Sequence, residues 1–142
     1  MIWVLDASVI LKWLLEDAER EPDTDTAMAI VQAVIDGRAA ILQPPHWLGE
    51  VAAVLARLTP ETAIEDVELL TALQWPVTED PQVMRRATQL AISTGGHLFD
   101  TLYHALALEH QDATLITADE RYIGKAQSQG RIQRLADWAP AK

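Results

Sequence analysis

The stretch that decides the fold lies near the N-terminus and reads Ile2-Trp3-Val4-Leu5-Asp6-Ala7-Ser8. The residues before Asp6 form a continuous apolar run, which is typical of a strand buried on both faces of a parallel sheet. The mostly apolar residues 9–15 then predict a helix. A buried strand that leads directly into a helix indicates the first unit of an α/β fold.

The rest of the chain continues this alternation. We expect further short strands at residues 40–42, 113–117 and 131–135. Capping and breaking residues predict helices over 23–35, around Glu50, from Thr59 and Pro60 onward, from Asp80 and Pro81 to Gly95, over 101–109, and from Asp119 toward Gln129. The sequence therefore predicts a three-layer α/β/α fold with a mainly parallel central sheet, as a single domain over residues 1–142.

Composition restricts the function classes. The net charge is −10, from 21 Asp and Glu against 11 Lys and Arg, which is the wrong sign for broad neutralisation of phosphates. A nucleic-acid substrate would need bound divalent cations, a few placed basic side chains, or a second subunit. Acidity that only keeps the protein soluble is the alternative.

Cellular location is constrained by two further features. The chain has no cysteine, which excludes disulfides and cysteine-built zinc sites and fits a reducing compartment, so cytoplasmic location is expected. The apolar stretch over residues 2–15 is interrupted by Asp6 and Lys12. We therefore expect neither a membrane span nor a signal peptide.

Two acids follow predicted strands directly. Asp6 comes after the first strand, and Asp119 follows the strand at 113–117 with one small residue between. Ligands of open α/β sheets bind beyond the carboxyl ends of the strands, so both positions are candidates for chemistry. Each acid also precedes a helix, and a purely structural role as an N-cap is the alternative.

Two further acids lie on predicted helices. Glu50 is at the edge of an apolar helix stripe, where a carboxylate needs either an ion-pair partner or a functional role. Asp100 opens the helix that contains His104, and stabilisation of the helix dipole is its structural alternative. We expect His104 to be a structural or exposed residue and not a metal ligand. His46, His97 and His110 have no metal-ligand spacing, and the sequence lacks an HExxH motif, a nucleophile elbow and a Gly-rich phosphate loop.

Four segments in this order resemble the PIN-domain family, especially the toxin nucleases of VapBC-type toxin–antitoxin pairs. They are Val4-Leu5-Asp6-Ala7-Ser8-Val9, Glu50-Val51-Ala52-Ala53-Val54-Leu55, Phe99-Asp100-Thr101-Leu102-Tyr103-His104-Ala105-Leu106-Ala107, and Leu115-Ile116-Thr117-Ala118-Asp119. The resemblance covers nearly the whole chain. The sequence departs from the family at Thr101, where alanine is frequent, and over residues 57–61, which lack a frequent basic cluster.

The resemblance implies a metal-dependent endoribonuclease. It implies that the acidic set holds Mg²⁺ or Mn²⁺ and cleaves RNA, with two hydroxyls in supporting positions. The acids are Asp6, Glu50, Asp100 and Asp119, and the hydroxyls are Ser8 and Thr117. A cognate antitoxin protein and a homodimer are further implications.

The chemistry of the residues agrees with a metal. Neighbouring carboxylates repel one another, and a divalent ion with oxygen ligands removes this repulsion. We expect Asp6 and Asp100 to be direct ligands, and Lys12, Arg121 and Lys125 to guide RNA unless they only form solvated helix faces. The main alternative function is a non-catalytic PIN-like subunit that binds an antitoxin-like partner. A small Mg²⁺-dependent phosphatase is less favoured, because Ser8 stands where a second acid would be needed.

Overall fold

Four parallel strands form one sheet in the computed structural model, which describes residues 1–15 and 23–140. The strands are β1 (Ile2–Leu5), β2 (Ala40–Ile41), β3 (Ala113–Thr117) and β4 (Ile132–Arg134), in the order β2-β1-β3-β4. The central positions of β1 and β3 explain their continuous apolar sequences, because both faces of a central strand are covered. The predicted parallel sheet is confirmed.

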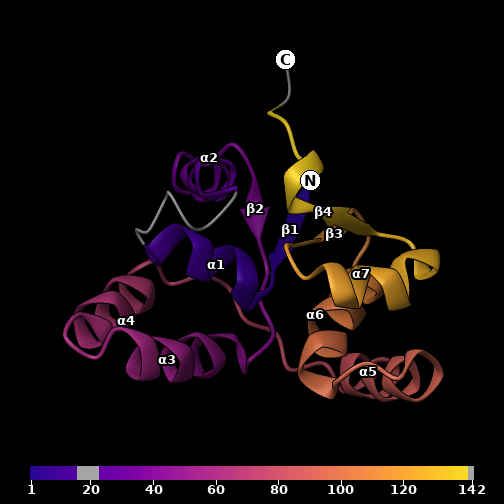
Figure 1. Ribbon diagram of the computed structural model, residues 1–142. Coiled ribbons are helices and arrows are strands. Elements are labelled where there is room, and N and C mark those ends of the chain that lie inside the picture. The colour runs from indigo at the N-terminus through magenta and orange to yellow at the C-terminus, as the bar shows by residue number, and fades with distance from the viewer. Residues whose placement is uncertain (16–22, 141–142) are drawn as a thin grey trace.

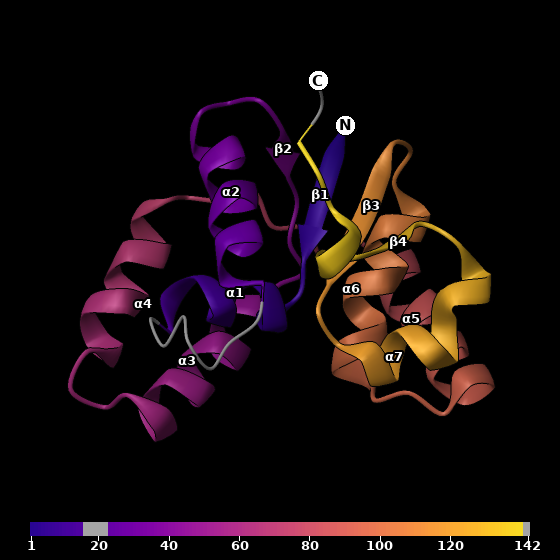
Figure 2. The same ribbon diagram turned by 45° about the horizontal axis from the view of Figure 1, so that its top comes forward.

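Helices cover the sheet from two sides. They are α1 (Ala7–Leu14), α2 (Thr24–Ile35), α3 (Trp47–Leu58), α4 (Ala63–Ala72), α5 (Pro81–Thr94), α6 (Leu98–Glu109) and α7 (Glu120–Ala126), with short 3-10 helices η1 (Gln127–Gln129) and η2 (Leu135–Asp137). Figures 1 and 2 show α1 to α4 on one side of the strands and α5 to α7 on the other. The prediction of a three-layer α/β/α fold is confirmed. None of the helices in the described part of the chain is both long enough and apolar enough to cross a membrane.

The α5 helix has the ends that its sequence predicts. The Asp80 carboxylate accepts a hydrogen bond from the Gln82 backbone N–H at 2.9 Å, and Pro81 occupies the first turn. Gly95 ends the helix with a φ of +72°, a conformation that residues with a side chain rarely adopt.

One predicted helix start is wrong. Thr59 does not cap the following helix but ends α3, where its backbone N–H and its hydroxyl both donate to the Leu55 carbonyl, at 2.8 and 3.2 Å. The next helix, α4, begins only at Ala63, after a turn. Smaller differences concern the ends of other elements: β2 and β4 are shorter than expected, α6 begins at Leu98, and α7 gives way to η1 after Ala126.

A buried side chain fixes the end of β1. Gln43, which is fully buried, accepts the Leu5 N–H at 2.9 Å through Oε1 and donates to the Leu5 carbonyl at 2.8 Å through Nε2. The side-chain amide thus takes the place of a peptide group in a neighbouring strand, beyond the end of β2. This pair of hydrogen bonds holds the backbone directly before Asp6.

Candidate active site

Asp6 is a buried carboxylate at the carboxyl end of β1, with an exposed fraction of 8%. The β1–β3 register pairs Leu5 with Ile116, which brings Asp6 beside Thr117. The hydroxyls of Thr117 and Ser8 both donate to the Asp6 carboxylate, and the Ser8 backbone N–H donates to it at 3.1 Å. Asp6 is therefore the N-cap of α1 and also the centre of a polar cluster between two central strands.

The two hydroxyls connect Asp6 with the loop that carries Asp119. Ser8 Oγ accepts the Ala118 N–H at 3.0 Å, and Thr117 Oγ1 accepts the Asp119 N–H at 3.0 Å. The Asp119 carboxylate in turn accepts the Tyr122 N–H at 3.0 Å and caps α7. Since each hydroxyl donates to Asp6 and accepts from this loop, the spacing between Asp6 and Asp119 is fixed by hydrogen bonds.

Glu50 approaches the same region from the other helical layer. It lies in the first turn of α3 and is half-buried. The Tyr103 hydroxyl from α6 donates to Glu50 Oε1 at 3.1 Å, and Tyr103 itself is fully buried. A neutral phenol is thus a hydrogen-bond partner of Glu50, for which an ion pair with a Lys or Arg was the structural alternative.

Asp100 is placed by the first turn of α6. The helix is capped by His97, whose Nδ1 accepts the Phe99 N–H at 3.1 Å. Burial raises the pKa of Asp100, and the charge of Asp119 raises it further, whereas His97 and Lys125 lower it. The charges of Asp119 and of Lys125 on α7 therefore both act on Asp100.

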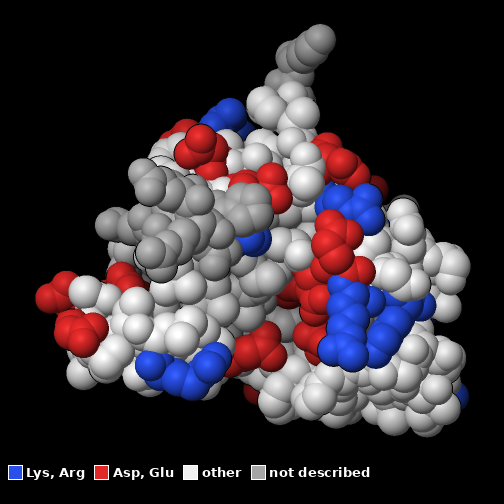
Figure 3. Space-filling view, viewed as in Figure 1, with Lys and Arg blue, Asp and Glu red and all other residues white. Residues whose placement is uncertain are grey.

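The four acids form one electrostatically coupled group. Burial raises the pKa of Asp6 to about 7, and the charges of Asp100 and Asp119 add to this effect against the hydrogen bonds from Ser8 and Thr117. Burial also raises the pKa of Glu50, with a further contribution from Asp100. Figure 3 shows acidic atoms gathered between the α1 and α3 side of the molecule and α7, with basic atoms beside them.

This group suits a hard divalent cation by its chemistry, because Mg²⁺ and Mn²⁺ prefer carboxylate oxygens and a cation would lower the raised pKa values. Among the described residues, however, no group of three or more His, Asp or Glu side chains is already arranged as a metal site. The acids are neighbours without a finished set of ligands. Such an arrangement fits Mg²⁺, which keeps several of its waters and uses few direct carboxylates.

A family model for the PIN domain matches residues 3–127 of the chain. The chain belongs to the PIN domain family. The match contains all four acids of the coupled group. No curated protein sequence matches the chain.

Two solved structures share the PIN fold over nearly the whole chain. VapBC-1 from nontypeable Haemophilus influenzae has a TM-score of 0.67 and 18% identity, covering 96% of this chain and 100% of its own. VapC20 of Mycobacterium tuberculosis, a toxin that cleaves the sarcin-ricin loop, has a TM-score of 0.60 and 15% identity, covering 88% of this chain and 96% of its own. At these identities the likeness establishes the fold.

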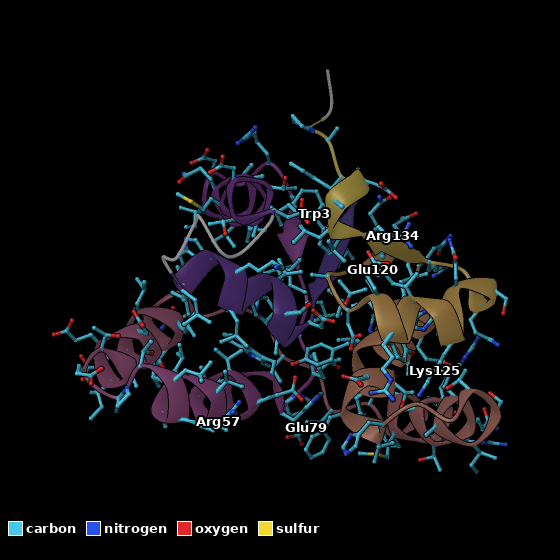
Figure 4. The ribbon with its side chains drawn as sticks, viewed as in Figure 1. Trp3, Arg57, Glu79, Glu120, Lys125 and Arg134 are labelled. Atoms are coloured by element: carbon cyan, nitrogen blue, oxygen red, sulfur yellow. The ribbon has the colours of Figure 1, made fainter. Side chains whose placement is uncertain are left out.

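The three predicted basic residues of this PIN domain lie in different places. Lys125 Nζ donates to the Gly95 carbonyl at 3.3 Å, and its charge acts on Asp100. Figure 4 shows Lys125 extending from α7 toward α5 and α6. Arg121 is exposed one turn earlier on α7, and Lys12 lies in the last turn of α1. Lys125 thus lies within the field of the acidic group.

Three polar residues of the PIN domain have their roles fixed by distant contacts. His104 is buried and its Nε2 donates to the Gly130 carbonyl at 2.8 Å, which leaves Nδ1 to accept the Tyr122 hydroxyl at 2.9 Å. The expectation of a structural role for His104 agrees with these contacts. Tyr103 and Gln43 were not expected to support the site. An amide directly after a predicted strand was the only sequence signal for Gln43.

Proposed function

We propose that this PIN domain is an endoribonuclease that hydrolyses RNA phosphodiester bonds with the help of Mg²⁺ or Mn²⁺. The observation that carries the proposal is the environment of Asp6, a buried carboxylate that accepts two hydroxyls and lies in the field of Asp100 and Asp119. Repulsion from two neighbouring acids makes a buried carboxylate less favourable, so the stability of the fold alone does not account for this arrangement. Perturbed acids of this kind gather at functional sites.

Each acid has a role in the proposed reaction. Asp6 and Asp100 would bind the metal directly, and Glu50 and Asp119 would complete the set directly or through water. The bound ion would lower the pKa of a water molecule and neutralise charge on the phosphate. Ser8 and Thr117 would orient the Asp6 carboxylate through their hydroxyl donors.

The chain itself supplies the group that accepts a proton. Oxygen of the attacking water would bond to phosphorus while the bond from phosphorus to a ribose oxygen breaks, and the leaving oxygen would take a proton from solvent water. Glu50 or Asp119 would accept the proton of the water. Tyr103 occupies Glu50 Oε1 as a donor, so Oε2 is the oxygen of Glu50 that is suited to this role.

The test is cleavage of RNA by the purified protein in the presence of Mn²⁺. We expect cleavage that EDTA abolishes and that Asp6→Asn reduces by at least about 100-fold. Asp36→Asn is the matched control, because Asp36 is exposed and pairs with Arg38 at the C-terminal end of α2. Intact RNA at high protein concentration would refute the nuclease and favour a non-catalytic subunit.

The proposal includes the toxin role in a toxin–antitoxin pair. A protein encoded beside this one would be the antitoxin, with an Arg side chain entering the acidic group, because a guanidinium replaces the charge of a metal and pairs well with carboxylates. Similarity to the VapBC-1 structure supports a partner of this kind. Co-purification with loss of RNA cleavage would support the pairing, and unchanged cleavage with every neighbouring protein would refute it.

The proposal also covers the assembly and the location of the protein. We propose a homodimer in the cytoplasm, where a chain without cysteines meets cellular RNA. Light scattering after size exclusion measures the assembly directly. A monomeric mass at micromolar concentration would refute the dimer without affecting the nuclease.

A further inference from the structure

Four aromatic side chains are packed together next to the acidic group. The ring of Phe99 lies 5.1 Å from that of His46 and 5.1 Å from that of His97, and the ring of His46 lies 4.7 Å from that of Tyr103. Phe99 directly precedes Asp100, and Tyr103 donates to Glu50. The aromatic cluster therefore extends from two of the acids to the surface.

Hydrogen bonds hold the rings in place. His46 Nε2 donates to the Phe99 carbonyl at 3.0 Å, and His97 Nδ1 accepts the Phe99 N–H at 3.1 Å. The remaining nitrogen of His46, Nδ1, is buried and has no hydrogen-bond partner in the described part of the chain. His46 thus contributes mainly an uncharged aromatic surface, and Phe99 is fixed at both its N–H and its carbonyl.

Phe99 is unusually exposed for an aromatic residue so firmly positioned. Its exposed fraction is 47%, although it lies in a helix that is otherwise rich in buried residues. A single exposed apolar side chain is ordinary by itself. A ring held beside the acidic group offers a flat apolar face to a ligand that is bound there.

We propose that Phe99, supported by His46 and His97, stacks against an unpaired base of the RNA next to the scissile phosphate. This inference rests on the proposed nuclease function and adds to it a side chain that contacts a base of the substrate. Bases of a duplex are stacked on one another, so their faces are not accessible to a side chain, whereas unpaired bases stack on aromatic rings.

A cation is positioned to hold the backbone of the same strand. Lys125 donates to the carbonyl of Gly95, in the turn directly before His97, and its charge reaches Asp100. Phosphate contacts position a nucleic acid, while base contacts select among substrates. A strand with its base on Phe99 and a phosphate near Lys125 would lie close to Asp100, which follows Phe99 in the sequence and is within the field of Lys125.

The test measures binding and cleavage separately. Binding of a fluorescent single-stranded oligoribonucleotide, alone or annealed to its complement, is followed by anisotropy with Mg²⁺, in the Asp6→Asn background that keeps the RNA intact. Cleavage is followed with Mn²⁺ in proteins that retain Asp6. Each assay compares Phe99→Ala, Phe99→Leu and Phe99→Trp with the control Ile92→Ala, since Ile92 is exposed on α5.

We expect Phe99→Ala to weaken binding of the single strand by about 5- to 150-fold, which is the range for loss of one stacked base. Phe99→Trp should bind as tightly as the wild type, because it keeps a flat aromatic ring. Phe99→Leu should bind as weakly as Phe99→Ala. The control Ile92→Ala should bind normally. Thermal unfolding of each variant shows how much packing against His46 and His97 is lost, and Phe99→Leu, which keeps an apolar side chain, separates that loss from the loss of stacking.

Several results would overturn the stacking site. They are normal binding by Phe99→Leu, an equal loss for the duplex, or no loss with Phe99→Ala. Loss of binding only to the co-encoded basic protein would make Phe99 a protein contact and would also overturn it. Cleavage that is unaffected by Phe99→Ala leaves the nuclease standing without the stacking site. Stacking-dependent binding without any cleavage refutes the nuclease alone.

Discussion

Replacing Asp6 by Asn should stabilise the metal-free protein at neutral and alkaline pH. Burial raises the pKa of Asp6 from an ordinary 3.8 to about 7 in the folded state. The ionised carboxylate is thus less favourable in the fold than in the unfolded chain. This unfavourable contribution is absent below pH 3.8, grows as the pH rises toward 7, and is complete above it.

The size of the effect follows from the shift. A difference of about three pKa units corresponds to about 4 kcal/mol of unfolding free energy above pH 7. Asn removes the charge but accepts only one of the two hydroxyls from Ser8 and Thr117 without rearrangement, which costs about 1 to 1.5 kcal/mol. The net stabilisation by Asp6→Asn should be about 2 to 3 kcal/mol at pH 8 and should vanish or change sign near pH 4.

Urea unfolding in EDTA at several pH values measures this directly, with Asp36→Asn as control. A bound cation should offset the destabilisation that the ionised Asp6 carboxylate causes, because the cation binds only the folded site. Adding Mn²⁺ should raise the unfolding free energy of the wild type at pH 8 and leave Asp6→Asn almost unchanged. A stability difference between the two proteins that does not grow with pH would refute the reasoning, even if cleavage were lost.

Three other substitutions test the supports of the site. Gln43→Leu should lower the unfolding free energy by about 2 to 4 kcal/mol in urea titrations, since it leaves both backbone groups of Leu5 buried and unpaired; a loss below about 1 kcal/mol would contradict a stabilising role for these two hydrogen bonds. Tyr103→Phe should reduce kcat about 10-fold with little change in thermal unfolding, because Glu50 loses its donor; unchanged kcat would argue against Glu50 as a participant. Lys125→Ala should raise KM for RNA and flatten its dependence on salt, and an unaltered salt slope would remove Lys125 from the RNA path.

The sheet and two of the acids could be predicted because their signals are local. The apolar runs of β1 and β3 are continuous, and each is followed by an acid at the carboxyl end. Parallel topology then brings Asp6 and Asp119 to one edge of the sheet without any knowledge of side-chain contacts. Both residues do cap a helix, as the structural alternative expected, and this role leaves room for the proposed function because both also belong to the coupled group.

The supporting contacts could not be predicted because they join residues far apart in sequence. Tyr103 and Glu50 are separated by 53 positions, and Leu5 and Gln43 by 38. Periodicity indicates that Glu50 is partly buried but does not identify its partner. The error at Thr59 has a similar origin, because a Thr-Pro pair is a start signal only if the preceding helix does not use the threonine to complete its own last turn.

The four acids come from both sides of the sheet, so the proposed metal would connect the two helical layers. Glu50 comes from α3 on one side of the sheet, Asp100 and Asp119 come from α6 and α7 on the other, and Asp6 lies at the end of a strand between them. Without a cation their mutual repulsion acts to separate the two helical layers, and the Tyr103–Glu50 hydrogen bond is one of the contacts that oppose it. A cation bound by acids from both layers would reverse the sign of this interaction. Amide hydrogen exchange in the first turns of α3 and α6 should therefore slow together when Mn²⁺ is added, and slowing in only one of them would place the metal within a single layer.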